Sequence, residues 1–75
     1  MSRRLPRLTA DQAIRVVQRF GFVQVRQSGS HRIFRHPQGI RITIPYHKGK
    51  ILHPKLVKAI ARDLGLSTEE LLKLT

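Results

Sequence analysis

The chain contains no cysteine among its 75 residues. Neither a disulfide framework nor a thiolate zinc site is therefore available to it. Acidic residues are almost as scarce, with four Asp or Glu against fifteen Lys or Arg and a formal net charge of +11. Between Asp11 and Asp63 there is no acidic residue, while eleven Lys or Arg lie in that interval. Such a charge favours nucleic acid, an anionic membrane or an acidic protein as the partner.

Long apolar runs are also missing. The basic start lacks the apolar segment of a signal peptide, and no stretch is long enough to span a bilayer. A basic amphipathic helix with aromatic anchors is absent too, which argues against a membrane-surface role. We therefore expect a cytoplasmic protein without a membrane partner. Its length and its 40% hydrophobic content predict a flexible basic arm at residues 1–8 and one domain at residues 9–75.

The remaining pattern predicts an α+β domain. The expected elements are a helix at about 10–20, strands at 22–27, 30–36 and 40–44, and helices at 54–64 and 67–74. Capping boxes at residues 9–12 and 67–70 mark two helix starts. Gly21 can supply the left-handed cap that ends the first helix, and Pro54 suits the first turn of the second. A three-stranded antiparallel meander cannot bury its apolar face alone, so the helices should pack across it and leave the other face wet. The basic side chains belong on that wet face.

Alternation assigns the strand side chains to faces. Ile40, Ile42 and Ile44 are expected to share the buried face of the last strand, while Arg41 and Thr43 point to the other. In the first strand, Val23 and Val25 share a face by the same period. These assignments predict which side of the sheet meets the helices.

The turn Gly29-Ser30-His31 delivers an imidazole to the start of the second strand. Histidine both takes and gives protons near neutral pH, so an imidazole on a polycationic surface suggests chemistry on a phosphodiester. If Phe34 is the core residue, His31, Ile33 and Arg35 share the open face. If Ile33 is buried instead, or a bulge follows Gly29, His31 turns inward. We favour the outward direction because Phe34 is the larger apolar group and because the inward one would bury Arg35.

Several segments resemble the HicA toxins of prokaryotic toxin–antitoxin systems. They are Gly21-Phe22, the turn at residues 27–31, Phe34, and residues 44–50, Ile-Pro-Tyr-His-Lys-Gly-Lys. The resemblance implies a fold similar to double-stranded-RNA-binding domains. It also implies a ribosome-independent mRNA interferase held inactive by a HicB antitoxin. The essential histidine of that family follows a Gly-Ser pair at the start of the second strand, which here can only be His31.

We therefore hypothesise a metal-independent toxin that cleaves single-stranded mRNA, with His31 transferring the proton and Tyr46 or His47 as a possible helper. The candidate phosphate-binding residues are Arg26, Arg32, Arg35, Arg41, Lys48 and Lys50. The alternative is a purely structural role, in which the His31 ring stabilises its turn by a hydrogen bond to a backbone carbonyl.

The other two histidines, His36 and His53, are expected to cap or to be solvated. The histidine spacings match no compact metal site, and no cofactor is expected. One alternative function is a non-catalytic RNA-binding module of the same fold. A second, a helix-turn-helix around Gly65, is disfavoured because Glu69 and Glu70 are unsuited to a DNA groove.

Overall fold

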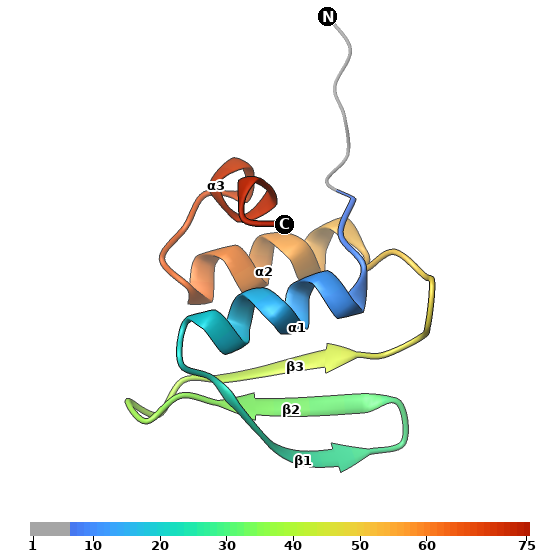
Figure 1. The fold of residues 1–75 in the computed structure, drawn as a ribbon, viewed down its shortest axis with the longest axis vertical. Helices are drawn as coiled ribbons and strands as arrows, with labels where there is room; N and C mark the ends of the chain where they lie inside the picture. Colours follow the sequence, from blue (N-terminus) through green and yellow to red (C-terminus); the bar gives the residue numbers. More distant parts are fainter. Residues whose placement is uncertain (1–6) are drawn as a thin grey trace, which may run out of the picture.

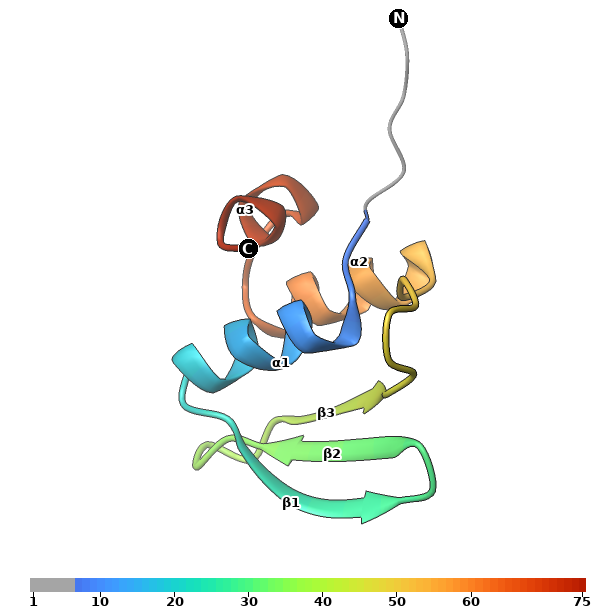
Figure 2. The ribbon, with the colours of Figure 1, turned by 45° about the vertical axis from the view of Figure 1, so that its right-hand side comes forward.

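Six elements follow one another in the computed structural model, which describes residues 7–75. They are α1 (Ala10–Arg19), β1 (Val23–Ser28), β2 (His31–Arg35), β3 (Arg41–Pro45), α2 (Pro54–Asp63) and α3 (Thr68–Lys73). The strands form one antiparallel sheet in the order β1-β2-β3, with the helices on one side of it (Figure 1, Figure 2). The predicted α-β-β-β-α-α order and the α+β class, similar to double-stranded-RNA-binding domains, are confirmed.

Both ends of α1 form as the sequence predicts. The Gln12 backbone N–H donates to Thr9 Oγ1 at 3.2 Å, and the Thr9 N–H donates to Gln12 Oε1 at 2.9 Å. This reciprocal pair satisfies two donors that the first turn of a helix leaves unpaired. At the other end Gly21 adopts a φ of +90°, and the Phe22 N–H donates to the Val17 carbonyl at 3.0 Å. A left-handed glycine thus ends α1 and turns the chain into β1.

The sheet register defines two faces. Phe34 of β2 pairs with Ile42 of β3, and both are buried beneath the helices with 0% and 3% of their surface exposed. Directly opposed residues share a face, so His31, Ile33 and Arg35 lie on the side away from the helices, which we call the open face. The expectation for Ile40 is wrong: it is 40% exposed and precedes β3. Its carbonyl instead closes the turn by accepting from the His36 N–H.

A bulge in β1 changes the predicted alternation of that strand. Gln24 pairs with Phe34, yet Arg26 pairs with Ile33, so Val25 is the additional residue. Val25 and Val23 are both exposed, at 56% and 62%. Bulges re-aim the side chains that follow them. Here the bulge places Arg26 on the open face, in the position that Val25 would take in a regular strand.

The core lies between the sheet and α1 and α2 and extends through the helix layer to α3. Its buried members are Leu8, Ala10, Ala13, Ile14, Val16, Val17, Phe22, Phe34, Ile42, Ile44, Leu52, Val57, Ile60, Ala61 and Leu71. The predicted arm at residues 1–8 is corrected at one residue, since the Leu8 side chain is fully buried and its carbonyl accepts from the Leu52 N–H at 2.7 Å. The folded domain therefore begins at Leu8 at the latest. Residues 1–6 of the predicted arm lie outside the described residues.

The last two helices also begin where expected. Pro54 is the first residue of α2, where its missing N–H costs nothing. Ser67 and Glu70 form the second capping box, which starts α3. Leu71 of α3 is 0% exposed and joins the core cluster, so α3 is packed against the helix layer on the side away from the sheet (Figure 1).

Candidate functional site

His31 lies at the first position of β2, directly after a tight turn. Gly29 has a φ of +58° in this two-residue turn between Ser28 and His31, as the first position of a type II′ hairpin requires. His31 pairs with Ser28 on one side and Pro45 on the other, and its side chain is exposed on the open face. The outward direction expected from the position of Phe34 is confirmed, because the bulge occurs in β1 and leaves β2 regular.

The four histidines differ in what their rings do. The Nδ1 atom of His36 accepts from the Gln38 N–H, and the Nδ1 atom of His53 accepts from the Lys55 N–H, both at 3.1 Å. These two histidines cap a turn and a helix, as expected. Within residues 7–75, neither His31 nor His47 makes a side-chain hydrogen bond. The turn-stabilising interpretation of His31 therefore lacks the bond that it requires.

Three of the predicted phosphate-binding arginines share the open face with His31. Arg26 pairs with Ile33, which is the next residue after His31 on the open face of β2. Arg35 pairs with Arg41 one step further along the same face. Successive rows on one face are about 7 Å apart. Arg26 is therefore the nearest of these cations to His31 along the sheet, and all three are exposed. Val23 and Ile33 supply apolar surface between the charges.

Two predicted site residues lie on the opposite, helix-covered face. Arg32 pairs with Ile44, and its guanidinium carbon lies 3.9 Å from the centre of the Tyr46 ring. The buried Arg32 Nε has no hydrogen-bond partner within the described part of the chain. The Tyr46 hydroxyl donates to Asp11 Oδ2 at 3.3 Å, and this bond to the carboxylate is the main reason why the pKa of Tyr46 is raised. The structure thus separates Arg32 and the Tyr46 hydroxyl from His31.

The β3–α2 loop brings further cations to the His31 end of the sheet. This loop and the β1–β2 turn lie at the same end (Figure 1, Figure 2), where the Tyr46 N–H donates to the Ser30 carbonyl at 2.6 Å. His47, Lys48 and Lys50 are all exposed on the loop. They extend the positive surface beyond the sheet edge, next to the turn that carries His31.

Charge is divided between the two sides of the sheet. All four acidic residues are on helices: Asp11 on α1, Asp63 on α2, and Glu69 and Glu70 on α3. The strands and the β3–α2 loop contain none. An approaching polyanion therefore meets no carboxylate on the open face, and the repulsion that a mixed surface would produce is absent there.

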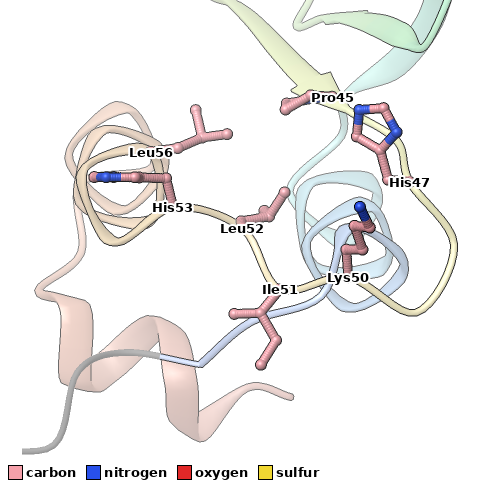
Figure 3. Close-up of a pocket in the computed structure, with 7 residues that line it drawn as sticks. All are labelled: Pro45, His47, Lys50, Ile51, Leu52, His53 and Leu56. Atoms are coloured by element: carbon pink, nitrogen blue, oxygen red, sulfur yellow. The ribbon is translucent and has the colours of Figure 1, made fainter.

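Two features of the site were not predicted from the sequence. The first is the stack of Arg32 on Tyr46. The alternation that points His31 outward could have indicated it, because the same alternation points Arg32 toward the helices. The second is a cleft lined by Pro45, the β3–α2 loop and the first turn of α2 (Figure 3).

No group of three His, Asp or Glu side chains placed to hold a metal occurs within residues 7–75. None of the helices in this part of the chain has the length and apolarity to cross a membrane.

Comparison with known proteins supports one family. No curated protein matches the chain. A family model described as the HicA toxin of bacterial toxin–antitoxin systems matches residues 10–66, from the start of α1 to just past α2. The match covers all three strands and the β3–α2 loop and leaves α3 outside. Because it spans more than half of the sequence, the chain belongs to the HicA family of toxins.

Proposed function

We propose that this toxin is a metal-independent endoribonuclease that cleaves single-stranded mRNA, with His31 as the proton-transfer group. The observation that carries the proposal is the state of the His31 ring. It is exposed on a face that holds Arg26, Arg35 and Arg41, and it makes no hydrogen bond within residues 7–75. An imidazole without a structural bond, on a surface suited to phosphates, is free to serve chemistry.

The reaction needs no group that the open face lacks. The ribose 2′-oxygen attacks the adjacent phosphorus, the bond from phosphorus to the 5′-oxygen breaks, and a 2′,3′-cyclic phosphate and a 5′-hydroxyl result. One proton leaves the 2′-hydroxyl and one reaches the 5′-oxygen. His31 transfers one of these two protons, and water accepts or donates the other. Proton transfer by a positioned side chain such as His31 raises the rate by a factor of about 10² to 10⁴. Arg26, one row away, stabilises the charge that develops on the phosphorane.

Binding is assigned to the cations that share the side of His31. We assign phosphate contacts to Arg26, Arg35 and Arg41 on the open face and to Lys48 and Lys50 on the β3–α2 loop. Arg32 is not included because its guanidinium lies against the Tyr46 ring on the other face. A single strand is the expected substrate, since in-line attack by a 2′-hydroxyl requires a locally flexible backbone.

The antitoxin partner of this toxin is proposed to be a HicB-type protein with an acidic surface. The open face and the β3–α2 loop carry five candidate phosphate ligands and no carboxylate. Acidic side chains of a protein would meet the same cations as RNA phosphates do. An antitoxin docked there would cover His31 and exclude RNA at the same time.

The test compares the wild type with His31→Ala on a defined single-stranded RNA in EDTA. We expect His31→Ala to lower the cleavage rate at saturating RNA by about 10²- to 10⁴-fold while RNA affinity stays near that of the wild type. The control is His36→Asn, which removes an imidazole from the far end of β2. The Asn side chain can still accept the Gln38 N–H. An RNA with a 2′-deoxy nucleotide at the cleavage site should resist both active proteins.

Three outcomes would count against the proposal. Cleavage retained by His31→Ala would remove His31 from the chemistry. RNA binding without cleavage by the wild type would favour a non-catalytic RNA-binding module. Cleavage of the 2′-deoxy RNA at the substituted position would exclude attack by the 2′-oxygen.

A further inference from the structure

A cleft lies beside the proposed site, at the end of β3. Its volume is about 290 Å³, and its lining residues are Pro45, His47, Lys50, Ile51, Leu52, His53 and Leu56. Figure 3 shows Leu52 between the loop and the first turn of α2, with Pro45 and the His47 ring next to each other at one side. The His53 ring points away from Leu52, in keeping with its role as the cap of α2.

The cleft adjoins His31 through the sheet register. Pro45, which lines the cleft, is the direct partner of His31 on the neighbouring strand. Opposed residues of an antiparallel pair have Cα atoms about 5 Å apart and side chains on the same face. A nucleotide whose phosphate lies at His31 therefore has its neighbour within reach of the cleft, without any change in the fold.

The lining suits one ligand class in particular. Pro45, Leu52 and Leu56 provide apolar surface, whereas His47 and Lys50 provide an imidazole and an ammonium group. No carboxylate is among the lining residues, so the cleft is complementary to a ligand that carries negative charge beside a flat apolar group. The volume is near the lower end of small-molecule sites, which is suitable for one planar ring system rather than a large cofactor.

We propose that this cleft binds one unpaired base of the RNA, next to the phosphate that His31 acts on; the inference rests on the proposed function. Single-stranded bases are bound by stacking on aromatic rings, His included, while nearby cations hold the backbone. The His47 ring is the stacking platform, Pro45 and Leu56 are the walls, and Lys50 neutralises the adjoining phosphate. His47 thereby becomes a binding residue rather than a second proton-transfer group.

Abasic RNA tests this directly. The wild type first identifies the cleavage position in a short fluorescein-labelled RNA. Affinities are then measured with His31→Ala, which keeps the RNA intact, for the same RNA with the base removed on either side of that position. We expect one of the two abasic RNAs to bind about 5- to 150-fold more weakly, since a stacked base contributes at this level. Removal of a base far from the cut serves as the matched control.

A second protein change ties the effect to the cleft. In the His31→Ala background, His47→Ala should weaken intact RNA but should not further weaken the sensitive abasic RNA, because both changes remove the same stack. His47→Phe, which keeps a stacking ring, should bind RNA more tightly than His47→Ala and should cleave it faster than His47→Ala in the protein with His31 intact. If His47 transferred a proton instead, His47→Phe would bind RNA normally and lose cleavage, and the inference would be wrong.

Other outcomes also overturn the inference, and they are distinguishable from failure of the proposed function. Equal affinity for intact RNA and both flanking abasic RNAs, with cleavage by the wild type intact, would refute the base site alone. So would equal weakening of intact and abasic RNA by His47→Ala. A wild-type protein that neither binds nor cleaves RNA would refute both the base site and the nuclease.

Discussion

Salt dependence of RNA binding measures how many cations of this protein touch phosphate. We propose that five do so, namely the exposed Arg26, Arg35 and Arg41 on the open face and Lys48 and Lys50 on the β3–α2 loop. For a single strand the slope of log K against log salt is about −0.7 per phosphate, so five contacts give about −3.5. A fourfold rise in salt should then weaken binding about 130-fold.

The perturbation is Arg41→Gln, and its matched control is Arg15→Gln. Both lower the formal net charge by one, from +11 to +10, and both positions are exposed. Arg41 lies on the open face, whereas Arg15 is on α1 on the other side of the sheet. Because Arg41→Gln loses one phosphate contact, its slope should be about −2.8. Its RNA affinity should then fall about 50-fold over the same fourfold rise in salt. The slope of Arg15→Gln should stay at about −3.5.

The assay is fluorescence anisotropy of a labelled single-stranded RNA at several KCl concentrations, with the His31→Ala background keeping the RNA intact. An equal change of slope for Arg41→Gln and Arg15→Gln would refute the reasoning. That result would mean that RNA responds to the net charge of the whole protein and not to contacts on one face. An unchanged slope for Arg41→Gln alone would remove Arg41 from the phosphate ligands.

Two further predictions concern stability. Leu71→Ala should lower the free energy of unfolding by about 2–5 kcal/mol in a urea titration, because the fully buried side chain leaves a cavity; Leu74→Ala, at a position 37% exposed, should cost far less. A cost for Leu71→Ala no greater than that for Leu74→Ala would show that α3 is not packed as described. The pKa of Glu70 is lowered below its usual 4.5 because its carboxylate accepts the Ser67 N–H. This stabilisation is present above pH 4.5 and is lost as the pH falls through the lower, folded-state pKa. Unfolding measured from pH 7 to pH 3 should show this loss in the wild type but not in Glu70→Gln, which keeps the capping bond without the charge; equal loss in both would contradict the assignment.

Much of the fold follows from local chemistry. The capping groups at Thr9 and Gln12, the glycine at 21 and the proline at 54 each act within one or two turns of a helix, so sequence alone places them. The direction of His31 also follows locally, from alternation with the fully buried Phe34 three residues on. These predictions hold because each depends only on neighbours along the chain.

The errors occur where a turn or a distant segment overrides the alternation of the chain. Ile40 is apolar and at the right spacing, yet the turn that closes on its carbonyl excludes it from the strand. The burial of Leu8 depends on pairing with Leu52, more than forty residues away, which no local pattern indicates. The bulge that turns Arg26 outward is a mismatch in length between two paired strands, so neither strand shows it alone. The cleft is different, since residues 45–56 alone line it, and its shape depends on how the loop between β3 and α2 folds.

The two faces of the sheet impose different constraints on the same strands. On the covered face Phe34, Ile42 and Ile44 fill the core, and changing any of them should cost stability first. On the open face Arg26 and Arg35 are exposed and are not part of the core, so changing them should cost little stability. The open face and the core meet where β3 ends, because Pro45 pairs with His31 on the open face and the loop that follows continues to the buried Leu52. A base bound in the cleft would therefore contact both the proposed catalytic end of the sheet and the edge of the core.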